Sequence, residues 1–179
     1  MQFRTLYLRS VLDRFKSLKD LGDRAIIQLT DEEIHWTPNH ESNSVATIVK
    51  HISGNMVSRW TDFLNSDGEK PYRNREQEFV DNIPSKKELI SIWEEGWNTL
   101  FETLNSLHEY DLSKEIFIRG EAHFVVDAIE RQLSHYSYHI GQIVFVGKQI
   151  KNSDWKCLSI PRGKSEEYTK ELLNHNHKL

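Results

Sequence analysis

Long stripes of apolar residues at helical spacing are the feature that most restricts how this chain can fold. In four segments the apolar residues recur every three or four positions, as they do on one face of an α-helix. Only 8 glycines and 4 prolines interrupt the 179 residues, which favours long helices over many short strands. The expected helices span about residues 3–29, 45–63, 85–107 and 125–150. The sequence therefore predicts an all-α four-helix bundle over residues 1–150, followed by a partly flexible extension at 151–179.

Local signals refine this outline. Thr30 to Glu33 and Ser85 to Glu88 each have the pattern of a capping box, so a short turn and the third long helix should begin there. A small hairpin is expected around Arg119-Gly120, just before the fourth long helix. That helix is apolar on nearly every side except around its histidines, and we expect it to be the most buried of the four.

A long polar stretch, Asn65–Glu78, follows the second expected helix. It exceeds the usual length of a helix connection, and long loops of this kind are often functional. Two interpretations stay open, a lid over a site and a solvated connector.

Composition narrows the class of protein. The formal net charge is −4 and no basic face is evident, so we expect no nucleic-acid partner. No run reaches the roughly 18 apolar residues that a membrane span needs. The single cysteine, Cys157, excludes an intrachain disulfide, and the first residues lack the apolar core of a secretory signal. A cytoplasmic location is expected.

Three histidines suggest a metal site. His135 and His139 lie four residues apart on an expected helix, so that their rings project from the same face. His51 lies beside the apolar stripe of another helix and can supply a third ligand. Three imidazoles with an open position are typical of catalytic metal sites, whereas structural zinc sites close with four ligands and favour cysteine. The alternative is that each histidine is a hydrogen-bonded structural residue.

Polar residues at the edges of the apolar stripes are candidates to line a pocket. Asn55, Gln132 and Gln142 lie at the same edges as the histidines, and their amides can both donate and accept hydrogen bonds. Arg59 and Arg131 lie nearby in sequence and can either bind a carboxylate or form structural ion pairs. Tyr136 stands where a metalloprotease of the His-Glu-x-x-His type has its glutamate base, which excludes that arrangement. No catalytic side chain is assigned, because no general base is obvious near the three histidines.

These residues resemble the DinB-like (YfiT-like) superfamily of metal-dependent enzymes. The resemblance rests on His51 within Val49–Asn55 and on the pattern His-x-x-x-His-x-Gly-Gln-Ile at His135–Ile143. The runs Gly54–Phe63 and Ser66–Pro71 are similar to a bacterial branch of the same superfamily. The likeness covers about residues 3–148.

The resemblance implies a bundle with up-down-down-up connections, often dimeric, and a divalent metal, usually zinc or nickel, on the three histidines. Characterised members include transferases and isomerases that use low-molecular-weight thiols such as bacillithiol or mycothiol. The expected function is therefore the transfer of such a thiol to an electrophilic small molecule. A metal-dependent hydrolase and a non-enzymatic stress protein that binds a metal or ligand remain as alternatives.

Overall fold

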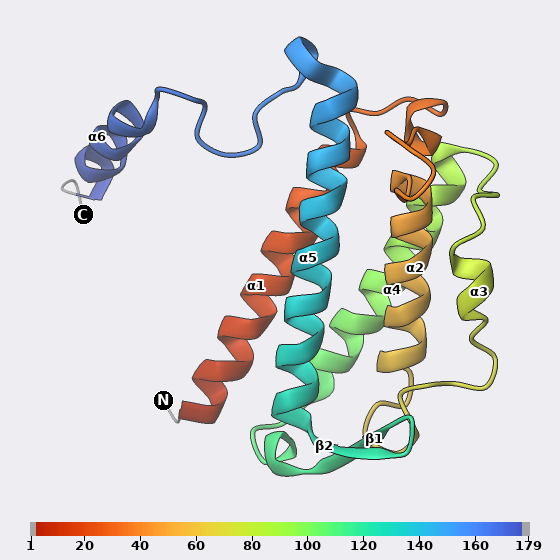
Figure 1. The fold of residues 1–179 in the computed structure, drawn as a ribbon. Helices are drawn as coiled ribbons and strands as arrows, with labels where there is room; N and C mark the ends of the chain where they lie inside the picture. The colour runs from red at the N-terminus through yellow and green to blue at the C-terminus, as the bar shows by residue number, and fades with distance from the viewer. Residues whose placement is uncertain (1–2, 177–179) are drawn as a thin grey trace.

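A computed structural model describes residues 3–176, and helices make up most of it (Figure 1). The α-helices and strands, in chain order, are α1 (Phe3–Ile26), α2 (Val45–Trp60), α3 (Arg75–Glu78), α4 (Lys86–Ser106), β1 (Glu115–Ile118), β2 (Glu121–Phe124), α5 (Val125–Lys151) and α6 (Ser165–Asn176). Short 3-10 turns lie at Glu33–His35, Asp111–Ser113 and Asn152–Asp154. The four long segments predicted from the apolar stripes are thus helical, with α1 ending three residues earlier than expected.

The long helices pack side by side around an aromatic centre. α1 lies against α5, α2 lies against α4, and α2 also contacts α5 (Figure 1). Phe15 from α1 meets Trp60 from α2 edge-on, with ring centroids 6.3 Å apart. The Trp60 Nε1–H donates to the Tyr136 hydroxyl of α5 at 3.1 Å, so these two buried side chains are joined by their polar atoms. This centre fixes how α2 faces α5.

The most buried long helix is α2, not α5 as the sequence predicted. α2 is the helix most enclosed for its length, with 13 of its 16 residues buried, whereas α5 has 9 of 27 buried. α2 is covered by α4, by α5 and by the loop that carries α3, while α5 turns one side to solvent. On that side, Tyr138 and Phe145 are 64% and 62% exposed.

The predicted caps and hairpin are present. Thr30 N–H donates to the Glu33 carboxylate at 2.8 Å, and Glu33 N–H donates back to the Thr30 hydroxyl at 3.2 Å. The Ser85 hydroxyl accepts from Glu88 N–H at the start of α4. β1 and β2 pair antiparallel around Arg119 and Gly120. Both of these residues have positive φ, 56° and 76°, as a tight two-residue hairpin turn requires.

Two helices lie outside the predicted pattern. The short α3 interrupts the polar stretch Asn65–Glu78, with the Asn74 side chain accepting from Gln77 N–H at its start. α6 lies in the C-terminal extension, apart from the long helices (Figure 1), and the side chains of its residues 165–174 are exposed. The end of the extension predicted to be flexible, beyond residue 176, lies outside the described residues. Within 3–176, no helix is long and apolar enough to cross a membrane.

Candidate metal centre

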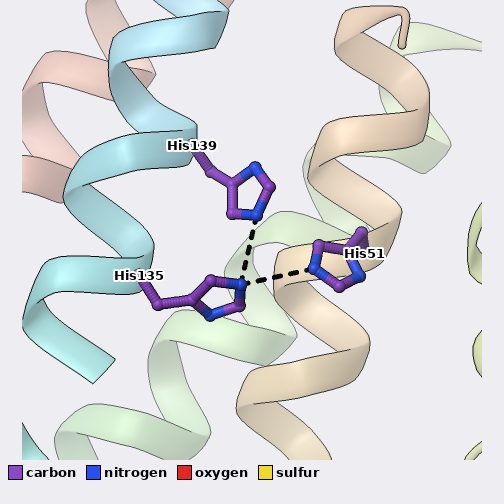
Figure 2. A group of neighbouring side chains, drawn as sticks. All are labelled: His51, His135 and His139. Carbon is purple, nitrogen blue, oxygen red and sulfur yellow. Dashed lines mark hydrogen bonds between the residues drawn. The ribbon is translucent and has the colours of Figure 1, made fainter. Parts of the chain in front are cut away.

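The three predicted histidines meet between α2 and α5. His51 comes from the middle of α2, and His135 and His139 come from successive turns of α5 (Figure 2). The Nε2 atom of His135 lies 3.4 Å from that of His51 and 3.1 Å from that of His139. All three offer a nitrogen within 4.8 Å of the others, and the group could hold a metal ion. We call these residues the histidine triad.

The nitrogen spacing fits one shared ion. Two nitrogens bound to the same tetrahedral zinc ion at about 2.0–2.1 Å lie about 3.3–3.4 Å apart. The two distances to His135 Nε2 are close to this value. Hydrogen bonding alone explains the cluster less well, because the one Nε2 of His135 can donate to only one of the other two rings at a time.

Hydrogen-bond acceptors hold the Nδ1 atoms of His51 and His139, so that the Nε2 atoms of both rings point at the centre of the triad. His51 Nδ1 lies 3.0 Å from Glu78 Oε2, and His139 Nδ1 lies 2.8 Å from Gln142 Oε1. Both oxygens accept hydrogen bonds, so each Nδ1 carries a proton, and in the neutral ring this leaves the lone pair on Nε2. Metal-binding histidines are usually oriented by such a partner.

Glu78 is itself fixed by a buried arginine. Arg73, with a side chain 2% exposed, donates from Nε to Glu78 Oε1 at 2.7 Å and from Nη2 to Oε2 at 2.9 Å. Burial alone would raise the pKa of Glu78, but the hydrogen bonds from His51 and Arg73 outweigh it and lower the pKa below its usual range. The carboxylate is therefore ionised and acts on the outer nitrogen of His51.

The electrostatic surroundings keep the other two rings neutral. Burial lowers the pKa of His135 to about 4, and the neighbouring His139, His51, Arg73 and Arg131 act in the same direction. Burial also lowers the pKa of His139, and the Gln142 hydrogen bond offsets only part of this effect. Neutral imidazole is the form that binds a metal ion, so both rings are ready as ligands at neutral pH.

An aromatic ring covers one side of the triad, and a cleft opens beside it. The Phe79 ring packs on His51 with centroids 4.9 Å apart. The cleft has a volume of about 520 Å³, and Gln142 belongs both to its wall and to the surroundings of His139. The residues that line it are Pro38, Glu41, Ser42, Asn43, Ile48, Tyr138, Gly141, Gln142, Phe145 and Val146. The cleft therefore meets the triad through Gln142, and the three histidines themselves are not among its lining residues.

The three predicted pocket residues occupy different places. Gln142 lines the cleft and holds His139. Asn55 is buried one turn below His51, where its Oδ1 accepts from the Tyr136 hydroxyl at 2.9 Å. Gln132 is buried on α5 with its Oε1 lacking a partner among the described residues.

Two residues of the site were missed by the sequence analysis. Glu78 and Arg73 both lie in the polar stretch after α2, and the sequence analysis found no carboxylate near the triad. The length of that stretch was the only signal of a functional role. Its end is now seen to reach the site through the contact between Glu78 and His51.

One protein family matches almost the whole chain. A family model described as a protein of unknown function (DUF1572) matches residues 2–164, and the chain belongs to this family. The search of curated proteins found no match. The match includes every long helix and all three histidines of the triad.

Proposed function

We propose that this chain is a metal-dependent enzyme of the DinB-like type, which transfers a low-molecular-weight thiol to an electrophilic small molecule. The observation that carries the proposal is the triad of pre-oriented imidazoles, of which burial keeps His135 and His139 neutral, together with an open cleft that meets the triad at Gln142. We further propose a four-helix bundle with up-down-down-up connections. The contacts of α1 with α5, of α2 with α4 and of α2 with α5 support it. So do the directions of these helices in Figure 1. Zinc or nickel is the proposed ion.

A divalent ion on three neutral ligands would keep its positive charge and an open position, and would lower the pKa of a thiol or water that occupies it. The protein's own residues then set the rest of the reaction. Glu78 and Gln142 keep His51 and His139 in the ligand tautomer. The cleft wall at Tyr138 and Phe145 offers exposed aromatic surface to an apolar electrophile.

The position of Glu78 favours a thiol over water as the nucleophile. A hydrolase usually needs a general base within hydrogen-bond reach of the attacking water. Glu78 is occupied by His51 and by two nitrogens of Arg73, and its side chain is 7% exposed. It is therefore a poor base for water in the cleft. A thiol whose pKa is already lowered needs no such base.

The test combines metal replacement with a panel of thiols. The cobalt-substituted protein should change its visible spectrum on addition of the productive thiol, and should consume a chloro-substituted bimane only when both thiol and metal are present. His139→Ala should lose both responses, while His40→Ala, at a fully exposed histidine, should keep them.

Three other results would replace the proposal. Hydrolysis of ester or amide substrates without added thiol would favour the hydrolase. Metal binding with no change on addition of any thiol, and no turnover, would favour a metal-binding stress protein. Absence of metal binding in the wild-type protein would remove the enzyme proposal altogether.

A further inference from the structure

A second pocket lies between α2, α4 and the loop that carries α3. Its volume is about 280 Å³, near the lower end of the roughly 300–1,000 Å³ of pockets that bind small molecules. On α2 it is lined by Lys50, Ser53, Gly54 and Val57, whose spacing puts them on one face of the helix. None of its lining residues borders the cleft at Gln142, and the proposed function gives it no role. We call it the α2–α4 pocket.

Two opposite charges line the α2–α4 pocket, and the chain pairs neither with an opposite charge. The ammonium of the half-buried Lys50 donates to two uncharged oxygens, the Val80 carbonyl at 3.0 Å and Asn82 Oδ1 at 2.6 Å. An ammonium has three N–H donors, so one remains available. Glu95 is exposed on α4, and its carboxylate forms no ion pair or hydrogen bond within residues 3–176. The pocket therefore offers one cation and one anion to a bound molecule.

The two charged side chains start close together because α2 and α4 touch beside them. A Cβ at Gly96 would lie 2.9 Å from the Cα of Ser53, so the two backbones meet at this point. Lys50 lies one turn before Ser53 on α2, and Glu95 directly precedes Gly96 on α4. Both side chains therefore leave their helices within about 5 Å, measured along the helix axes, of one crossing point. One small molecule can contact both of them.

Apolar surface and an unpaired hydroxyl complete the pocket. Val57 and Ile92 are half-buried on the two helices, and Tyr72, which also lines the pocket, is 63% exposed. Ser53 is 2% exposed, and its Oγ has no hydrogen-bond partner in the described part of the chain. Native proteins leave few buried polar groups without a partner. A molecule that fits here combines an apolar group with polar ones.

The pocket also borders the residues that orient the triad. Glu78 and Arg73 belong to its wall, and Glu78 Oε2 lies 3.0 Å from His51 Nδ1. Gly54 makes room for this carboxylate, since a Cβ at Gly54 would lie 2.6 Å from Glu78 Oε1. The pocket and the triad therefore share one carboxylate as a neighbour, although the pocket and the cleft at Gln142 are separate.

We propose that the α2–α4 pocket binds a free amino acid with an apolar side chain. The carboxylate of the amino acid accepts from Lys50, and its ammonium donates to Glu95. Its side chain lies on the apolar surface of Val57 and Ile92. A carboxylate alone would leave Glu95 unpaired, and an amine alone would leave Lys50 unpaired, so a zwitterion matches the pocket best. Binding here requires no reaction at the triad.

Leucine and two analogues, each of which lacks one of its charges, test the ligand class. Isocaproate lacks the ammonium, and isoamylamine lacks the carboxylate. Each is added at constant ionic strength to the isotope-labelled full-length protein, and the backbone amide signals are followed by NMR. Leucine should shift the amide signals of Ser53–Val57 and Ile92–Glu95, which border the pocket, and should bind more tightly than either analogue.

Variants at the two charges test the contacts. Lys50→Met and Glu95→Gln should each weaken leucine binding by about two- to fivefold, the range of ion pairs that are partly exposed to water. Lys16→Met on α1 and Glu102→Gln on α4, at exposed side chains outside the pocket, should bind leucine like the wild type. Glu95→Gln removes no ion pair within the described chain, so it tests the site even where Lys50→Met disturbs the loop.

The outcomes decide both the place and the ligand. Shifts at the pocket amides, tighter binding of leucine than of both analogues and weaker binding by Glu95→Gln support the site. A wild-type protein whose amide signals do not respond to leucine up to its solubility limit overturns it. Equal binding of leucine and one analogue overturns the choice of a zwitterion. Shifts confined to the cleft around Gln142 overturn the assignment to the α2–α4 pocket.

Discussion

The stretch Asn65–Glu78 holds two carboxylates in opposite ways. Asp67, near its start, accepts hydrogen bonds only from backbone N–H groups, two of them at the turn between β1 and β2. Glu78, at its end, receives its hydrogen bonds from the side chains of His51 and Arg73. The first carboxylate ties loop to hairpin and would be needed in any protein with this backbone. The second carboxylate orients a candidate metal ligand.

This difference separates fold from function within one loop. A carboxylate that satisfies backbone donors stabilises the local chain. A carboxylate that fixes the tautomer of a histidine gains its purpose only from what the histidine binds. The two contacts also bear on the lid interpretation, because they anchor both ends of the stretch to the long helices and the hairpin. Four predictions test the comparison, beginning with the largest expected effect.

Removing a triad histidine should remove the metal. His51→Ala, His135→Ala and His139→Ala should each lose most of the zinc that the wild-type protein retains after dialysis, because two imidazoles and water bind zinc far more weakly than three imidazoles. Metal analysis by mass spectrometry measures the content. His40→Ala is the control. Stoichiometric zinc in all three triad variants would disprove the assignment.

Changing Glu78 should weaken metal binding without removing a ligand. Glu78→Gln keeps the shape of the side chain but places an NH₂ group against either His51 Nδ1 or Arg73. We expect a loss of zinc affinity of about 10- to 100-fold. Competition with a chromophoric chelator measures this at a temperature where circular dichroism shows the variant folded. Glu76→Gln, an exposed glutamate in the same loop, should bind zinc like the wild type.

The sequence predicted those parts of the site that depend on helix periodicity. The spacing of His135 and His139 fixes both rings on one side of α5, and the helical wheel placed His51 beside the core stripe of α2. Glu78 could not be predicted in the same way. It reaches His51 from a stretch without periodicity, and its position depends on how the whole loop packs on α2.

Two features that the sequence did not predict correctly, the exposed side of α5 and the helix α6, also depend on how the chain packs. α5 is rich in apolar residues, yet Tyr138 and Phe145 lie at the cleft and are exposed. The pattern shows which residues can be buried, whereas burial itself depends on which helices cover them. α6 was missed because its residues 165–174 are exposed and include only three apolar side chains, Tyr168, Leu172 and Leu173, which are too few to mark a helix by periodicity.

Changing Asp67 should reduce stability and leave the metal site intact. Asp67→Asn replaces one acceptor oxygen by an NH₂ group, so at least one of the three backbone N–H groups loses its partner. We expect the free energy of unfolding to fall by about 1–2 kcal/mol, since Asp67 is only half-buried and water replaces part of the loss. Urea denaturation measures the change, with Asp13→Asn on α1 as the exposed control. If Asp67→Asn lowered zinc affinity as much as Glu78→Gln does, the two carboxylates would not have separate roles.

The smallest expected effect is the pH dependence of the Asp67 contribution. Burial alone would raise the pKa of Asp67, but the backbone N–H groups and the nearby Arg59 outweigh it and hold the pKa below its usual range. The folded protein therefore binds this proton less tightly than the unfolded chain does, where the pKa of aspartate is about 3.9. The contribution of Asp67 to stability is then complete well above pH 4 and is lost as the pH falls through the folded pKa. The difference in unfolding free energy between the wild type and Asp67→Asn should accordingly stay constant from about pH 7 to pH 5 and shrink below about pH 4. Subtracting the variant removes the other carboxylates, whose titration is common to both proteins. A difference that grew as the pH fell would mean that the Asp67 pKa is raised in the folded protein, and the backbone clamp would then not be what holds the start of the loop.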